Sequence, residues 1–245
     1  ARQGFNLVLI ARRGKLLKTL AADLEKSRGV EARILVQDLE KPDADRKIAK
    51  AASGLDVGLV VYNAARSLIG PFLDGALEAH QGELGVNCRT PLGLAWHFGR
   101  LMKKKGRGGI ILMSSLSCAQ GSPRIAHYAA TKAWNLILAE GLWHEWRLHG
   151  VDVLGCIAGT VDTPAYRASR PAADMKPMDP SRVAREGMAS LGKRPSVITG
   201  FGNKISGLAM RRILPRRMAI EIIGGALKKM YAPGPHRGSN ASCCD

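Results

Sequence analysis

The sequence predicts a single α/β domain built on a doubly wound parallel sheet with helices on both faces. Apolar runs of strand length alternate along the chain with helix-length amphipathic stretches, which is the rhythm of parallel β-α units. Most of these runs are apolar throughout, as strands covered on both faces should be. With 245 residues, 46% of them hydrophobic, the chain can bury a substantial core. Ligands of such sheets bind beyond the carboxyl ends of the strands, so functional residues are expected there.

The apolar runs predict strands, and the amphipathic stretches between them predict helices. Strands are expected at residues 6–10, 32–36, 57–62, 109–113, 151–157 and 196–199. Helices are expected near residues 14–27, 43–52, 77–104, 125–148 and 180–191. The Pro- and Ala-rich stretch 163–180 is expected to form a long loop, and loops of that length often act as functional lids.

The sheet domain is expected to span residues 1–200, followed by a basic extension. Residues 201–231 are apolar with paired basic residues, and Pro215 is expected to divide them into two helices. Such a segment either lies on anionic lipid or packs its apolar face on the domain or a partner subunit, and packing is favoured. Residues 232–245, rich in Pro, Gly and Ser, are expected to be a disordered tail.

The formal net charge of +17 predicts attraction to phosphate in a cofactor, a nucleic acid or an anionic lipid. No zinc-finger or aromatic RNA-binding motif accompanies the charge, so no nucleic-acid partner is expected. The five cysteines have no C-x-x-C spacing, which predicts reduced thiols and no metal site. No apolar run is long enough to span a membrane, so a soluble cytoplasmic protein is expected, with any membrane-surface contact made through residues 201–231.

Three residues form the most informative pattern. Ser115 follows an apolar run, and Tyr128 and Lys132 lie four residues apart in a predicted helix, where this spacing places them on one face. A neighbouring cation favours the phenolate, so Lys132 is expected to lower the pKa of Tyr128 toward neutrality. Tyr128 can then exchange a proton with a carbonyl or alcohol oxygen while Ser115 hydrogen-bonds that oxygen. The trio suits carbonyl reduction or alcohol oxidation, although Tyr-x-x-x-Lys also arises by chance.

Further motifs follow the predicted strands in order. They are Asp38-Leu39, Asn63-Ala64-Ala65, Asn87 within the helix 77–104, and Ala158-Gly159-Thr160-Val161-Asp162-Thr163. Singly, each has an ordinary explanation, since aspartate and asparagine are common in turns. Asn87 is harder to explain in this way, because asparagine is mildly unfavourable inside a helix.

Together with the trio, these motifs resemble those of the short-chain dehydrogenase/reductase family over residues 1–200. The resemblance implies a Rossmann-type fold and an NAD(P)-dependent enzyme. It implies that Tyr128 donates the proton to the nascent alkoxide, and that Lys132 also binds the nicotinamide ribose. It implies that Asn87 supports a proton relay from Lys132 to solvent. The family spacing favours Ser115 over Ser114 as the hydroxyl that binds the substrate oxygen.

The resemblance also implies where the cofactor binds. Contacts are expected from Arg12, Arg13, Asp38, Leu39, Asn63, Ala64, Ala65, Tyr128, Lys132, Ala158, Gly159, Val161 and Thr163. NAD-specific relatives carry an acidic residue where this chain has Arg12-Arg13, and a cation there favours the 2′-phosphate of NADP. We therefore expect NADP(H) to be preferred over NAD(H).

The chain departs from the family pattern at its amino terminus. The family's glycine-rich turn, Thr-Gly-x-x-x-Gly-x-Gly, has no counterpart, so the first strand and this turn are expected to be missing by truncation. Gly200-Phe201-Gly202 does not replace the turn, because Ile205 stands where its third glycine should be. Ala65 and Ala158 replace a family glycine and proline, which leaves every reacting group in place.

The expected function is NADP-dependent interconversion of a carbonyl and an alcohol. Tyr166, Met175 and Met178 suggest an apolar, lipid-like substrate such as a fatty-acyl or steroid ketone. By the same resemblance, the helices 77–104 and 125–148 are expected to build a homodimer or homotetramer. The alternative is a catalytically impaired nucleotide-binding or membrane-surface protein of the same family.

Overall fold

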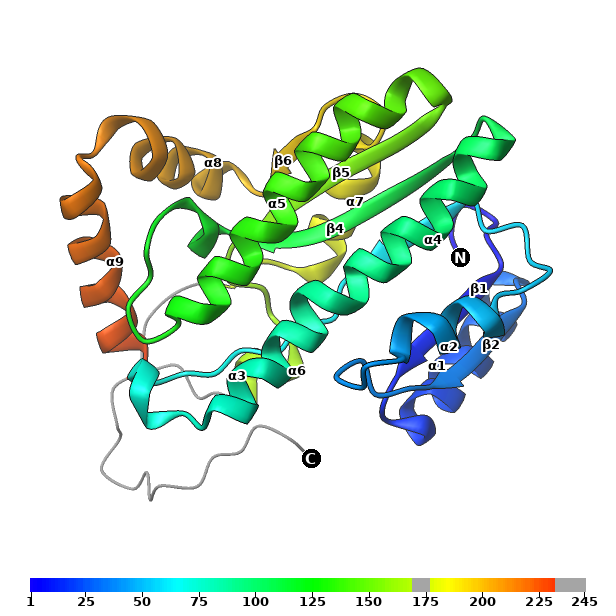
Figure 1. The fold of residues 1–245 in the computed structure, drawn as a ribbon, viewed down its shortest axis with the longest axis horizontal. Helices are drawn as coiled ribbons and strands as arrows, with labels where there is room; N and C mark the ends of the chain where they lie inside the picture. Colours follow the sequence, from blue (N-terminus) through cyan, green and yellow to red (C-terminus); the bar gives the residue numbers. More distant parts are fainter. Residues whose placement is uncertain (169–176, 232–245) are drawn as a thin grey trace.

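The computed structural model describes residues 1–168 and 177–231 of the chain. The predicted tail, 232–245, lies outside these residues, and so does Met175. Within them the protein has the predicted α/β architecture, in which parallel strands are flanked by helices (Figure 1).

The first two strands form a small parallel sheet. β1 (Leu7–Ala11) pairs with β2 (Ala32–Val36), and α1 (Gly14–Arg28) connects them. Gly29 ends α1 in the left-handed conformation, with φ 65°, which glycine adopts without a steric penalty. α2 (Ala44–Ala51) follows β2 and packs against a helix of the larger part of the molecule.

A second parallel sheet has four strands. They lie in the order β3 (Leu59–Tyr62), β4 (Gly108–Ser115), β5 (Val151–Ala158) and β6 (Ser196–Ile198). β4 and β5 pair along their whole length. Most of their residues are buried, which explains why their sequences are mostly apolar, with Ser114, Ser115 and Asp152 as the exceptions.

Helices cover both faces of this sheet. Side chains of α4 (Thr90–Lys105) and α5 (Ala126–Trp146) pack with Ile110 and Leu112 in one buried cluster. Side chains of α7 (Pro180–Ser190) pack in a separate cluster that contains Ile111 and Leu154. Because consecutive strand residues point to opposite faces, the alternation along β4 shows that the two clusters lie on opposite sides.

Within the described residues the parallel strands form two separate sheets. β1 and β3 do not pair with each other, and each is hydrogen-bonded to a strand on one edge only. The smaller sheet lies beside the larger one, at the lower right of Figure 1. Ile10 and Leu35 of the smaller sheet pack against the core cluster of the larger one, so the two share a hydrophobic core.

The predicted helix 77–104 is also interrupted. α3 (Leu77–Leu84) runs into a π-helical turn, Gly85–Arg89, before α4 begins. Pro91 has no N–H to donate to the carbonyl of Asn87 four residues earlier, so a regular α-helix cannot continue through this point with all its bonds.

The carboxyl-terminal segment forms two helices, as predicted. α8 (Phe201–Leu208) is followed by a π-helical turn, and α9 (Arg216–Met230) begins directly after Pro215. The predicted loop 163–180 contains a helix that the sequence did not indicate, α6 (Pro164–Ala168). Among the described residues, no helix has both the length and the apolar character needed to cross a membrane.

Candidate active site

A large open groove runs past the carboxyl ends of strands from both sheets. Its volume is about 4440 Å³, and it is lined by β1 and β3 along their whole lengths as well as by the segments that follow β1, β3, β4 and β5. Every predicted site residue lines it except Asn87, which is fully buried. Residues far apart in the sequence therefore share one cavity, as expected for a parallel α/β fold.

The predicted catalytic trio is brought together by β4 and α5. Ser115 is the last residue of β4, Tyr128 lies in the first turn of α5, and Lys132 follows one turn later. The Lys132 ammonium is 5.6 Å from the centre of the Tyr128 ring, and the side chains of Ser115 and Tyr128 are hydrogen-bonded. The strand end and the helix start thus present two hydroxyls and an ammonium to the same part of the groove.

Lys132 is held in place by β4. It is only 3% exposed, and its Nζ donates a hydrogen bond to the carbonyl of Met113 at 3.0 Å. The Ser114 hydroxyl donates to the backbone carbonyl of Lys132 at 2.7 Å. Ser114 therefore has a structural partner, which supports Ser115 as the hydroxyl available to a substrate.

The expected lowering of the Tyr128 pKa is wrong for this structure. Burial raises the pKa of Tyr128 to about 12, and the hydrogen bond from Ser115 opposes this rise without overcoming it. Burial also lowers the pKa of Lys132 to about 8, although the nearby Cys88 and Glu83 oppose the change. Desolvation is therefore the largest influence on the pKa of both groups.

Asn87 supports the site from behind. Its Oδ1 accepts a hydrogen bond from the Arg66 amide at 2.9 Å, and its Nδ2 donates to the Arg66 carbonyl at 2.8 Å. The same Nδ2 donates to Thr131 Oγ1 at 2.9 Å, next to Lys132 in α5. The side chain thus ties the turn after β3 to the catalytic helix, which is a positioning role; a part in a proton relay stays a prediction.

The π-helical turn frees two backbone carbonyls that other residues then bind. The Thr90 amide donates to Gly85 rather than to Val86, and the free Val86 carbonyl accepts a hydrogen bond from the Tyr62 hydroxyl of β3. The Asn87 carbonyl, which Pro91 cannot serve, accepts one from Asn135 Nδ2 of α5 at 2.8 Å. The turn is consequently fastened to both the sheet and the catalytic helix.

The nucleotide side of the groove contains two free cations. Arg12 and Arg13 directly follow β1, are exposed, and form no ion pair within residues 1–168 and 177–231. The small residues Ala64 and Ala65 follow β3 and line the groove with short side chains. Exposed cations and a buried ammonium, Lys132, thus line the same groove, and such groups can bind a phosphate and a ribose hydroxyl.

Asp38 has a local role in addition to its predicted one. Its Oδ1 accepts a hydrogen bond from the Glu40 amide at 3.0 Å and so stabilises the turn after β2. Glu40 in turn forms an ion pair with Arg66 at 2.6 Å. This pair, which the sequence did not indicate, joins the turn after β2 to the turn after β3 across the two sheets.

The segment after β5 folds over the groove. Val161 forms a bridge with Met178, and Thr163 Oγ1 accepts a hydrogen bond from the Tyr166 amide at 3.1 Å, at the start of α6. Gly159 packs so closely on the Asn203 side chain that an added Cβ would lie 2.6 Å from it. Any larger residue at this position would force the Asn203 side chain to move.

The sequence did not predict that α9 forms a wall beside Tyr128. Leu227 and Met230 of α9 are buried against Ile125, and Tyr128 and Tyr231 pack on the same cluster. Leu227, Met230 and Tyr231 also line the groove. The favoured interpretation of residues 201–231, packing on the domain, is thus confirmed for this end of α9.

Comparison with known proteins assigns the chain to a family. The family model for short chain dehydrogenases matches residues 1–174. A 7beta-hydroxysteroid dehydrogenase of Clostridium sardiniense is 32% identical over 207 residues, which cover 83% of this chain and 79% of the relative. A very-long-chain 3-oxoacyl-CoA reductase of Pyricularia oryzae is 32% identical over 201 residues, 78% of this chain and 59% of the relative.

A solved structure agrees with these matches. The structure of a 7beta-hydroxysteroid dehydrogenase superposes with a TM-score of 0.87 and 30% identity, over 91% of this chain and 88% of that one. The fold, the ordered motifs and these relatives all lead to one assignment. The chain belongs to the short-chain dehydrogenase/reductase family of NAD(P)-dependent enzymes that interconvert carbonyls and alcohols.

Proposed function

We propose that the protein reduces a hydrophobic, lipid-like ketone with NADPH, and that it also catalyses the reverse oxidation. The observation that carries the proposal is the placement of Tyr128, Ser115 and Lys132 beside an apolar wall. When bound, the cofactor supplies the hydride. The chain's own residues bind the carbonyl oxygen and deliver the proton.

Tyr128 is suited to donate a proton at neutral pH. With a pKa of about 12 it is fully protonated there, and its hydroxyl lies beside that of Ser115. Two donors at one point stabilise the negative charge that develops on the carbonyl oxygen during reduction. Lys132, one turn away, binds a ribose hydroxyl, and its positive charge stabilises the negative charge left on the tyrosine oxygen as the proton leaves.

The substrate class follows from the walls of the groove and from the relatives. Leu116 and Met210 line it together with the α9 residues Leu227 and Met230, so the wall beside Tyr128 is largely apolar. Relatives named for a hydroxysteroid and for a very-long-chain acyl-CoA act on lipid-like molecules. A ketone on a large apolar skeleton would bury its apolar surface against this wall, which favours its binding.

NADPH is favoured over NADH by the cations after β1. Arg12 and Arg13 are exposed and unpaired within the described residues, so they can form charge-assisted hydrogen bonds to a 2′-phosphate without first breaking an ion pair. An NAD-binding site of this fold would need an acceptor for ribose hydroxyls at that place.

The first prediction concerns Tyr128. In Tyr128→Phe, kcat/KM for ketone reduction should fall at least about a hundredfold, because the proton donor is lost while the ring is kept. NADPH binding, followed by cofactor fluorescence, should be unchanged. Tyr231→Phe, which removes a neighbouring hydroxyl, is the matched control and should keep most of the rate. If the unaltered chain turns over no hydrophobic ketone with bound NADPH, the catalytically impaired alternative is favoured instead.

The second prediction concerns pH. The pKa of Lys132 is lowered to about 8, so its charge is present below that pH and is lost above it, whereas Tyr128 stays protonated. The kcat/KM for reduction, measured in the presence of EDTA, should therefore decline above about pH 8. The charge of Glu83 raises the Lys132 pKa, so Glu83→Gln should move the decline to lower pH. A profile that stays flat through this range would contradict the role of Lys132.

The third prediction concerns cofactor choice. Arg12→Glu and Arg13→Glu should each raise the Kd for NADPH about tenfold or more, since a charge-assisted hydrogen bond is replaced by repulsion, and leave the Kd for NADH nearly unchanged. Arg28→Glu, an equally exposed arginine in the last turn of α1, is the control. Equal losses for both cofactors would argue against recognition of a 2′-phosphate.

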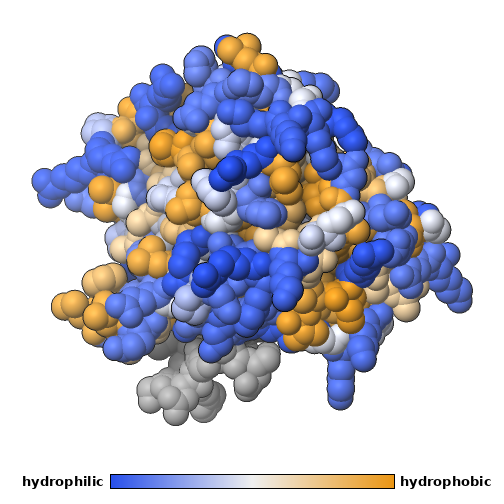
Figure 2. Space-filling model, turned by 45° about the vertical axis from the view of Figure 1, so that its right-hand side comes forward, coloured by the Kyte–Doolittle hydropathy of each residue, from blue (hydrophilic) through white to orange (hydrophobic). Residues whose placement is uncertain are grey.

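Two exposed apolar surfaces lie outside the groove, and we propose a separate use for each. Leu92 and Trp96 of α4 and Ile137 of α5 are 49%, 61% and 64% exposed, which suits a homo-oligomer interface. Phe201 and Ile205 of α8 are 71% and 56% exposed, near the cations of the following turn, which suits peripheral contact with anionic lipid. Figure 2 shows such hydrophobic patches among hydrophilic residues on one face.

The fourth prediction separates these two uses. Ile137→Asp should lower the mass measured by light scattering and leave sedimentation with anionic vesicles unchanged. Ile205→Asp should abolish vesicle binding and leave the mass unchanged, because each charge is costly only where its surface is buried. If both variants behave like the unaltered chain in both assays, neither surface has the proposed use.

A further inference from the structure

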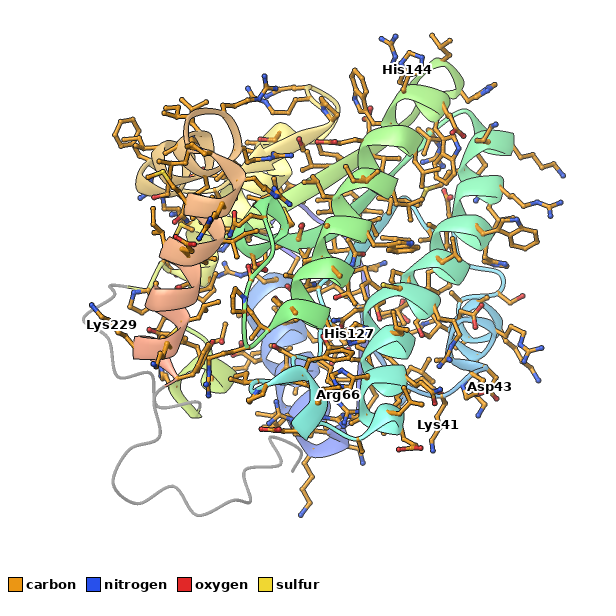
Figure 3. All side chains as sticks on the ribbon, turned by 60° about the vertical axis from the view of Figure 1, so that its left-hand side comes forward. Lys41, Asp43, Arg66, His127, His144 and Lys229 are labelled. Atoms are coloured by element: carbon orange, nitrogen blue, oxygen red, sulfur yellow. The ribbon has the colours of Figure 1, made fainter. Side chains whose placement is uncertain are left out.

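A cluster of two histidines and a glutamate lies where α3 meets the start of α5, beside the residues of the proposed reaction. His80 and Glu83 are one turn apart in α3, and His127 precedes Tyr128 in α5. One ligand atom from each of the three lies within 4.8 Å of the others. Figure 3 shows His127 at the start of α5, at the opposite end of that helix from His144.

The orientation of His80 leaves its Nδ1 lone pair facing His127. The Nε2 of His80 lies 3.1 Å from the Phe72 carbonyl, and since a carbonyl can only accept, Nε2 must carry the proton. The neutral ring then has an unprotonated Nδ1, which lies 3.2 Å from Nδ1 of His127. A histidine that binds a metal through one ring nitrogen usually donates a hydrogen bond from the other to a backbone carbonyl or carboxylate.

Glu83 supplies a buried carboxylate with unused capacity. Its side chain is fully buried, Oε2 accepts a hydrogen bond from the Leu68 amide at 3.1 Å, and Oε2 lies 3.7 Å from His127 Nδ1. Its other oxygen, Oε1, is buried without any hydrogen-bond partner among the described residues. A buried carboxylate that lacks a partner is costly, and a cation would satisfy it.

We propose that His80, Glu83 and His127 bind a Zn²⁺ ion. Two imidazole nitrogens and a carboxylate are a known donor set for zinc, at ligand distances of about 2.0–2.2 Å. The two nitrogens, 3.2 Å apart, are already at a spacing that one such ion can bridge, while the carboxylate must move closer to complete the set. The ion takes the place of the proton that otherwise bridges the two Nδ1 atoms.

The site is open on one side. His80 and His127 line the groove, and His127 keeps 17% of its side chain exposed, so a water can occupy a fourth coordination position. The three ligands come from two helices, and the Phe72 carbonyl fixes one of them. Zn²⁺ would thus fasten α3 to the first turn of α5, the turn that contains Tyr128, and so act as a structural or regulatory ion beside the reaction.

The test is metal binding, which does not depend on the proposed reductase activity. The protein should be studied with Cys243→Ser and Cys244→Ser in place, because adjacent thiols also bind zinc. Isothermal titration with Zn²⁺ should give one site per chain, and Zn²⁺ should raise Tm whereas Mg²⁺ should not. Co²⁺ bound in its place should give a visible d–d spectrum.

Matched variants decide the location of the site. His80→Gln and His127→Gln should each weaken Zn²⁺ binding about tenfold or more and remove the Co²⁺ spectrum, and Glu83→Gln should do the same while keeping the buried volume. His144→Gln, an exposed histidine at the far end of α5, should bind as the parent does. Circular dichroism confirms that each variant is folded. Unchanged binding in both histidine variants, or no stoichiometric binding by the parent, overturns the proposal.

Discussion

The arrangement of the site depends on the helix interruption at Gly85–Arg89. The π-helical turn leaves the Val86 carbonyl free to bind Tyr62, and the missing N–H of Pro91 leaves the Asn87 carbonyl free to bind Asn135. The same turn places Asn87 where its amide reaches the backbone of Arg66. One local break thereby connects β3, the turn that follows it and α5.

Burial then determines the electrostatics around the reacting groups. Lys132 and Glu83 are both almost inaccessible to solvent, yet they are not paired with each other; each instead lowers the cost of ionising the other through space. A lysine whose pKa lies near 8 changes its charge readily, and this makes it sensitive to any cation that neutralises Glu83. The proposed zinc site and the proposed reaction would therefore influence each other through Glu83.

The strands and the trio could be predicted from the sequence because both depend on local information. Continuous apolar runs identified β4 and β5, and the spacing of Tyr128 and Lys132 identified the face of α5. The raised pKa of Tyr128 could not be foreseen, because it reflects how many atoms from other elements surround the ring. The helix interruption and the separate sheets also depend on contacts between distant residues, which no local pattern records.

The two sheets raise the question of what holds the groove in shape. β1 and β3 share no backbone hydrogen bonds, so the usual ladder of a continuous sheet does not join them. Their alignment rests on α2 packing against α4 and on the ion pair between Glu40 and Arg66 at the groove itself. The ion pair is partly exposed and by itself weak, but Asn87 holds the Arg66 backbone from behind. Asn87 therefore ties α5 to the turn whose Arg66 pairs with Glu40, and its loss should disturb both contacts together.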